Sequence, residues 1–225
     1  MLLSEGDWQA IALTLRLAAT STVILLLLGT PLAYWLSRKR GNLVTLIEAI
    51  VALPLVLPPT VLGFYLLLAL APDSLLGRLW QTAAGDQLAF TFWALVCGSV
   101  VYSLPFVVQP LQQAFMRVPS KLLAASATLG ASPIDQFRSV ILPMSRRSFI
   151  VAGALGFAHT VGEFGVVLMI GGNIPGETRV LSIALYDHVE ALDYSSAHQL
   201  ALGLLCFSLV LLFFLYRDKG WRLGR

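Results

Sequence analysis

The sequence predicts an all-α integral membrane protein with about five membrane-spanning helices. Of its 225 residues, 57% are hydrophobic and only 12% are charged, and the mean hydropathy is +0.80. A soluble domain carries roughly 25% charged residues. Apolar runs of about 20 residues recur along the chain, and each is long enough to cross a bilayer as a helix. The predicted spans are Trp8–Leu36, Val44–Ala71, Phe90–Leu111, Ser148–Ile170 and Gln199–Tyr216.

The first apolar run is predicted to be a span and not a signal peptide. It is preceded by Glu5 and Asp7 where a signal peptide has a basic stretch. It is also too long for the apolar core of such a peptide.

Prolines interrupt the second and third spans. Pro58 and Pro59 lie inside the second span, followed by the hydroxyl of Thr60. Each proline removes a backbone donor and kinks a helix, and the freed carbonyls need protein or a water-lined cavity around them. The break therefore indicates a pathway through the membrane, or else a packing kink. Ser103 and Pro105 repeat the pattern more weakly in the third span.

The segment between the third and fourth spans, about residues 117–147, is predicted to form two short helices joined by a corner. Ser120 can cap the first helix, and Gly130 is suited to the left-handed position that ends it. Ser132 and Asp135 form a capping box around a proline at the start of the second helix. Its apolar side chains are Leu122, Leu123, Ile134 and Phe137. Such a unit can insert into a groove of a soluble partner, or lie on the membrane surface as an amphipathic connector.

The fourth span carries ionisable residues within apolar sequence. His159 and Glu163 are four residues apart, so a continuous helix places them on one face, with Thr160 beside them. An ionisable residue inside a span is a candidate functional residue, so these three are candidates for lining the pathway. The alternative is a structural ion pair, and we expect Glu163 to pair with Arg16 of the first span.

A turn is expected after the fourth span, at Gly171–Arg179. Pro175-Gly176 predicts a tight turn of type II, because glycine readily adopts the positive φ that this turn requires. The turn is either a plain loop or a contact for an external partner.

Basic residues predict the orientation. Most of the 15 Lys and Arg lie in three segments on one side of a five-span arrangement: residues 38–40, 117–147 and 217–225. By the positive-inside rule this side is cytoplasmic, with the N-terminus outside and the C-terminus inside. The N-terminus and the outer loops, near Asp73–Gln87 and Gly171–His198, together carry most of the acids. The topology explains the net charge of +3 without a nucleic-acid partner.

No motif for catalysis is recognisable. The chain has no phosphate-binding loop, no His/Cys cluster with metal-ligand spacing and no nucleophile–base pattern, and Cys97 and Cys206 fall inside apolar spans. We expect a single transmembrane domain over residues 1–225 that is not an enzyme and binds no cofactor. If it drives uphill transport, another subunit must supply the energy.

The segment Ala124–Pro143 resembles the coupling loop of binding-protein-dependent ABC importer permeases. That pattern is Glu-Ala-Ala, three residues, Gly, nine residues and Ile-x-Leu-Pro, and the chain departs from it in lacking the glutamate. Ser126 also stands in place of the second alanine. The positions aligned with the pattern are Ala124, Ala125, Ser126, Gly130, Leu142 and Pro143. The strings Leu53–Tyr65, Gly162–Gly165 and Asn173–Arg179 are similar to those of molybdate ABC transporter permeases, and sulfate and thiosulfate permeases share a looser version of the last.

The resemblance implies the MetI-like fold of type I importers in a bacterial cytoplasmic (inner) membrane. It implies a second permease subunit, two cytoplasmic ATP-binding subunits that use ATP and Mg²⁺, and a periplasmic or lipid-anchored oxyanion-binding protein. The expected function is molybdate import by alternating access. Tungstate, sulfate and thiosulfate remain open as substrates, as does a channel or secondary transporter without an ATPase.

Overall fold

The computed structural model describes residues 3–217, and all regular elements in this range are helical. Three of the basic residues expected to mark the cytoplasmic tail, Lys219, Arg222 and Arg225, lie outside the described residues. The helices are α1 (Glu5–Arg38), α2 (Asn42–Ala52), α3 (Pro59–Leu70), α4 (Leu75–Ala84), α5 (Phe92–Met116), α6 (Ser120–Thr128), α7 (Pro133–Gln136), α8 (Leu142–Val161), α9 (Gly165–Gly171), α10 (Leu181–Glu190) and α11 (Tyr194–Arg217). A short 3₁₀ turn, Leu53–Leu55, follows α2, and a π-helical turn, Phe137–Ile141, joins α7 to α8.

Four helical stretches are long and apolar enough to cross a membrane, and a fifth span is possible if one bent pair is counted. The predicted number of spans is therefore compatible with the structure. The bent pair is the second predicted span, in which Asn42–Leu55 and Pro59–Leu70 make an angle of 111°. Pro58 caps α3 and Pro59 occupies its first turn, where a missing N–H costs nothing. The proline pair therefore separates two helices.

The prolines of the third span act differently. Pro105 and Pro110 both lie inside α5, which continues as one helix from Phe92 to Met116. Pro105 therefore does not break this span.

The fourth predicted span has different limits. Its helix continues back from Ser148 through Leu142 and the π-helical turn, and it ends at Val161. The residues predicted as its outer end form a separate helix, α9. Two further helices, α4 and α10, occupy segments that the sequence predicted as outer loops.

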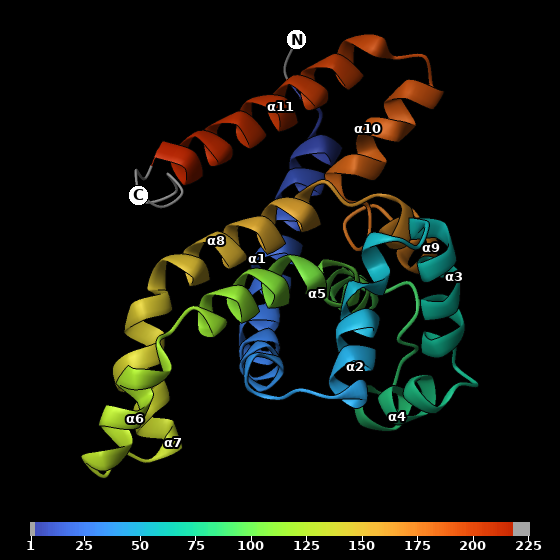
Figure 1. Cartoon of the computed structure of the whole chain (residues 1–225). Helices are drawn as coiled ribbons and strands as arrows, with labels where there is room; N and C mark the ends of the chain where they lie inside the picture. Colours follow the sequence, from blue (N-terminus) through green and yellow to red (C-terminus); the bar gives the residue numbers. More distant parts are fainter. Residues whose placement is uncertain (1–2, 218–225) are drawn as a thin grey trace.

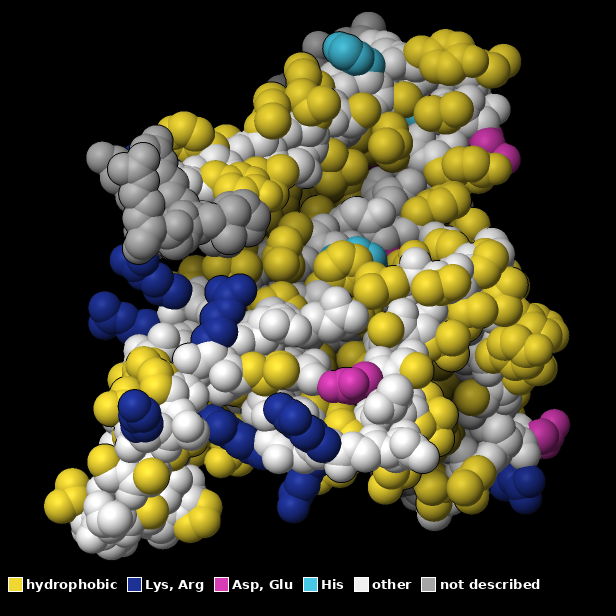
Figure 2. Space-filling model, in the orientation of Figure 1, with side chains coloured by type: hydrophobic (Ala, Val, Ile, Leu, Met, Phe, Trp, Pro, Cys, Tyr) yellow, Lys and Arg dark blue, Asp and Glu magenta, His cyan; other side chains and the backbone are white. Residues whose placement is uncertain are grey.

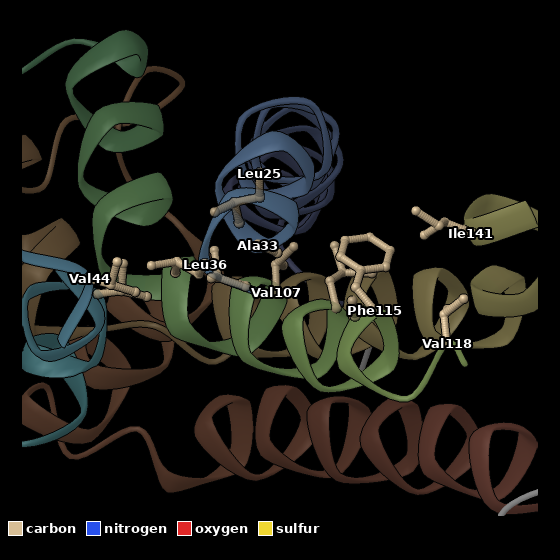
Figure 3. Close-up of a cluster of buried hydrophobic side chains, with 12 residues drawn as sticks. Leu25, Ala33, Leu36, Val44, Val107, Phe115, Val118 and Ile141 are labelled. Atoms are coloured by element: carbon tan, nitrogen blue, oxygen red, sulfur yellow. The ribbon is translucent and has the colours of Figure 1, made fainter. Parts of the chain in front are cut away.

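The main core lies where α1, α5 and α8 pack on one another (Figure 1). Leu25, Val107 and Phe115 are buried there among other aliphatic side chains (Figure 3). Gly156 of α8 permits this contact, because a Cβ there would lie 2.8 Å from Val107 Cγ2. By contrast α11 touches mainly α10 and α8, and most of its apolar surface is exposed in the single chain.

The unit α6–α7 projects from the rest of the molecule (Figure 1). Lys and Arg side chains gather on this part of the surface, whereas the opposite side is largely hydrophobic (Figure 2). Arg38 at the end of α1 donates to the carbonyl of Phe115 near the end of α5, at 3.4 Å. The first two basic segments therefore lie at the same end of the helices.

Candidate functional site

The projecting α6–α7 unit has the predicted shape. Gly130 has φ +84°, and two hydrogen bonds close the end of α6: Gly130 N–H to Ala127 O at 2.9 Å and Ala131 N–H to Ser126 O at 3.0 Å. This is the Schellman pattern, in which a left-handed residue ends a helix. Ser132 and Asp135 then form the expected capping box at the start of α7. Local sequence thus determines the corner.

In two respects the α6–α7 unit differs from the prediction. Ser120 is the first residue of α6 and does not cap it; Pro119 is the cap residue, and it makes no side-chain cap bond. Of the four apolar side chains expected to project, Leu123 and Phe137 instead pack on the main core. They anchor the unit, because they are its contacts with the buried cluster. Leu122, Leu129 and Ile134 are the large apolar side chains exposed on the unit, and Leu129 is 88% exposed.

The other residues of the resembling segment lie along its two helices. Ala124 and Ala125 are exposed on α6, and the Ser126 hydroxyl donates to Leu123 O at 2.8 Å. Leu142 and Pro143 begin α8 directly after the π-helical turn.

A second candidate site is an open pocket of about 580 Å³ at the break between α8 and α9. It brings together Thr60 of α3, Tyr102 of α5 and His159 of α8, with Glu163 in the break itself. The full lining is Pro59, Thr60, Tyr102, Ala158, His159, Gly162, Glu163, Phe164 and Gly165. Gly165 permits the approach of α9 to α3, since a Cβ there would lie 2.8 Å from Pro59 Cβ.

The pathway candidates are thus mostly neighbours in space. Pro59, Thr60, His159 and Glu163 line the pocket, and Pro58 adjoins it as the cap residue of α3. Ser103 and Thr160 do not line the pocket; they are buried behind the side chains that form its wall. Ser103 Oγ lies 2.9 Å from His159 Nδ1 and 3.2 Å from Thr160 Oγ1.

Sequence reasoning missed the aromatic residues around His159. The Phe106 ring stacks on the imidazole with centroids 4.0 Å apart, and the Tyr102 ring lies at 4.8 Å. Their spacing of four residues along α5 was the available signal, because it places both rings on one helix face.

The expected ion pair of Glu163 is wrong. Because α8 ends at Val161, Glu163 does not lie on the same face of a continuous helix as His159. Arg16 instead places its guanidinium over the Phe92 ring, 4.3 Å from the centroid. Within residues 3–217, both carboxyl oxygens of Glu163 are buried without a hydrogen-bond partner.

The turn after α9 is held by its own polar side chains. Gly176 has φ +78°, as the predicted turn requires. The Thr178 hydroxyl, fully buried, donates to Gly171 O at 2.7 Å. Asn173 and Arg179 both contact the Asp187 carboxylate of α10, Arg179 at 2.9 Å. Much of the Asn173–Arg179 string therefore stabilises the turn, and its tip stays exposed.

Outside the membrane-spanning helices, Asp193 lies just before α11 and accepts a hydrogen bond from the Ser196 N–H at 3.2 Å. The side chain and backbone of Ser196 hydrogen-bond the Asp193 carboxylate and lower its pKa. Among the described residues there is no group of three or more His, Cys, Asp or Glu side chains placed to hold a metal ion.

Comparison with known proteins places this arrangement in a family. Residues 9–217 match the family described as "Binding-protein-dependent transport system inner membrane component". The chain is 55% identical over 224 residues to the molybdenum transport system permease protein ModB of Azotobacter vinelandii, covering 100% of this chain and 99% of that protein. It is 31% identical to ModB of Escherichia coli K12, with 100% of both chains covered.

Solved structures agree on the fold. The chain superposes on a bacterial alginate ABC transporter with a TM-score of 0.76 at 16% identity, covering 98% of this chain and 81% of that one. For the inward-facing MetNI methionine ABC transporter, the TM-score is 0.71 at 20% identity, covering 96% and 94%. The fold is that of MetI-like, type I ABC importer permeases. The chain belongs to the binding-protein-dependent transport system inner membrane components, as a multi-pass permease of the ABC importer class.

Proposed function

We propose that this chain is the permease subunit of an ATP-driven molybdate importer and that it works by alternating access. The observation that carries the proposal is similarity over the whole chain to the Azotobacter vinelandii molybdenum permease, at 55% identity. In this proposal residues 1–225 act as one transmembrane domain, and the substrate passes between two copies of the chain.

The energy comes from partner subunits. Two cytoplasmic subunits bind and hydrolyse ATP with Mg²⁺, and this chain contributes neither a nucleotide site nor a cofactor site. The exposed apolar side chains Leu122, Leu129 and Ile134 support docking of the α6–α7 unit in a groove of an ATPase subunit. The coupling residues are Ala124, Ala125, Ser126, Gly130, Ser132, Asp135, Leu142 and Pro143. Nucleotide-driven movement of that groove then biases the permease between inward-open and outward-open states.

The orientation has the N-terminus outside and the C-terminus in the cytoplasm. The basic surface around α6–α8 and the end of α1 supports a cytoplasmic location for this end (Figure 2). The exposed tip Pro175–Glu177 then faces outward, where a binding protein delivers the oxyanion.

The pathway includes the pocket at the α8–α9 break. The assigned residues are Pro58, Pro59, Thr60, Ser103, His159, Thr160 and Glu163. The position of the pocket supports the assignment, because non-helical backbone within a membrane domain is tolerated where it lines a cavity.

Sulfate is the second candidate substrate. The chain is 33% identical over 193 residues to the sulfate permease protein CysT of Synechococcus elongatus, covering 86% of this chain and 69% of that protein. Molybdate, tungstate, sulfate and thiosulfate are similar dianions, so a binding protein can supply much of the selectivity.

One reconstitution tests the proposal. The chain is co-purified with its ATPase subunit and binding protein, placed in proteoliposomes, and assayed for radiolabelled molybdate uptake with excess tungstate, sulfate or thiosulfate. We expect uptake that requires ATP and the binding protein, with stronger competition by tungstate than by sulfate. Uptake without an ATPase, or uptake of sulfate alone, contradicts the proposal.

A further inference from the structure

The imidazole of His159 is held in one orientation at the wall of the pocket. Ser103 lies at hydrogen-bond distance from Nδ1, Phe106 stacks on one face of the ring, and Tyr102 packs against it. The other ring nitrogen, Nε2, makes no hydrogen bond to the part of the chain that the structure describes. Because His159 lines the pocket, Nε2 is the nitrogen available to a molecule that enters it.

The hydrogen bonds behind the ring determine which nitrogen carries the proton. The Thr160 hydroxyl donates its proton to Gly156 O at 3.0 Å, because a carbonyl can only accept. Ser103 must then donate to Thr160 Oγ1 at 3.2 Å, which leaves Ser103 Oγ as an acceptor. His159 Nδ1–H supplies the remaining proton, across 2.9 Å. This is the arrangement that satisfies all three contacts, and it is inferred from the network as tautomers ordinarily are.

A neutral imidazole protonated at Nδ1 presents a lone pair at Nε2. A lone pair cannot donate to a fully deprotonated oxyanion, whose oxygens only accept. Contact between the two therefore requires one additional proton. Either Nε2 is protonated, giving an imidazolium beside a dianion, or the oxyanion arrives with a hydroxyl that donates to Nε2.

The rest of the pocket makes His159 the principal site for such a contact. Neither Lys nor Arg is among the lining residues. Thr60 and Tyr102 offer neutral hydroxyls, and an ionised Glu163 carboxylate only accepts hydrogen bonds and repels a dianion. A pathway must bind its substrate weakly enough to release it, and neutral donors suit this need better than a permanent cation. The titratable groups beside the ring are Tyr102 of α5 and Glu163 between α8 and α9. The polar side chain that α3 contributes, Thr60, does not titrate.

We propose that His159 contacts the oxyanion through Nε2 and that each oxyanion bound there shares one solvent-derived proton with this nitrogen. The proposal rests on the proposed function and adds to it a contact residue and a linkage to protons. Ser103 is a positioning residue in this scheme: it acts only by fixing the proton on Nδ1. The new bond is an N–H on Nε2 or an O–H on the oxyanion, and solvent provides the proton in both cases.

The sign of the linkage follows from proton uptake on binding. Occupancy of the pocket rises as pH falls, and a linkage of one proton changes the apparent affinity by up to about tenfold per pH unit. The complete assembly with ATPase and binding protein is assayed in proteoliposomes between about pH 5 and 8, the range in which histidines commonly titrate. The readout is the initial rate of molybdate uptake at limiting loaded binding protein, divided by the rate for Ser21→Ala at the same pH.

Ser21→Ala is the matched control. Ser21 of α1 and Ser103 of α5 are both fully buried, but Ser21 does not line the pocket, and its hydroxyl has no hydrogen-bond partner among the described residues. Division by its rate cancels the pH dependence of the ATPase and of the binding protein, which are identical in every preparation. We expect the wild-type ratio to stay constant with pH.

His159→Gln places a permanent amide near Nε2, so its ratio should rise relative to wild type as pH increases. Ser103→Ala frees the ring to carry its proton on Nε2 as a neutral donor, so it should also lose the requirement for an extra proton, with its ratio rising in the same direction. A merely structural role for Ser103 would lower uptake equally at all pH values.

The proposal is overturned if both variants have ratios that do not change with pH. Ser103→Ala decides alone if His159→Gln does not fold, because it removes one buried oxygen and little volume. Absence of oxyanion uptake by the wild-type assembly contradicts the proposed function, whereas uptake with pH-independent ratios contradicts only this inference.

Discussion

Replacing Gly130 with valine should uncouple ATP hydrolysis from transport. Gly130 has φ +84° at the corner between α6 and α7. A residue with a Cβ in the left-handed region costs about 1–2 kcal/mol, because the Cβ approaches the following carbonyl oxygen. No atom lies within 4 Å of a Cβ built at Gly130, so no steric clash adds to this cost.

The magnitude then follows from backbone strain alone. A cost of about 1–2 kcal/mol lowers the population of the native corner relative to alternatives by about 5–30-fold. The unit is small and exposed, so few buried contacts oppose such a change. If an ATPase groove accepts only the native corner, docking weakens by a similar factor.

The assay uses proteoliposomes with the ATPase subunit and binding protein. Molybdate uptake per ATP hydrolysed should fall for Gly130→Val, and less ATPase subunit should co-purify, while the yield of inserted permease stays near that of wild type. Gly130→Asn should retain most of the coupling, because asparagine tolerates the left-handed region better than other residues with a side chain.

Gly176→Val provides the matched control. Gly176 has φ +78° and open space around it, so valine meets the same strain in the turn after α9, away from the α6–α7 unit. It should leave ATPase association unchanged. Equal loss of association in both variants, or unchanged uptake and association in Gly130→Val, would refute the argument from the corner.

Three further predictions concern other parts of the chain. Glu163→Gln should leave the folded yield and thermal stability unchanged or higher, because it removes a buried carboxyl without a partner, and a charge there costs up to about 2.5–3.5 kcal/mol on insertion scales; a clear loss of yield would indicate a partner for the carboxyl. With Cys97 and Cys206 replaced, a cysteine at Gly176 should react with an impermeant thiol reagent from outside and one at Ser132 should not, and the reverse labelling would contradict the orientation. Asp7→Ala should lower the free energy of unfolding by about 1–2 kcal/mol and with it the melting temperature. Asp7 is 3% exposed, accepts the N-terminal capping bonds of α1 and contacts His188 Nε2 at 2.9 Å. An unchanged melting temperature would show that these bonds are dispensable.

Local rules predicted local structure well. The corner at Gly130 and the capping box of Ser132 and Asp135 depend on residues a few positions apart, so the sequence contains all the information they need. The same holds for the break at Pro58–Pro59, where missing N–H groups cannot be compensated within one helix.

The ion pair of Glu163 could not be predicted reliably, because it depended on two assumptions about distant structure. One was that the helix continues to Glu163, whereas it ends at Val161. The other was that similar depth brings Arg16 to the same place, whereas Arg16 lies over Phe92. Apolar residues lie on both sides of the end of α8, so hydropathy does not indicate where the helix ends. The only local signal for that end was the pair of glycines that follows it, Gly162 and Gly165.

The pocket arises because two helix breaks from different spans meet. Pro59 begins α3 after one break, Gly165 begins α9 after the other, and the absence of a side chain at Gly165 lets the two approach. Either break alone would leave backbone groups without partners in a membrane, which is tolerated only beside protein or a cavity. Facing each other, they place His159 and Glu163 at a shared opening. This location is suited to substrate passage because the helices on each side of it can move relative to one another without breaking a regular helix.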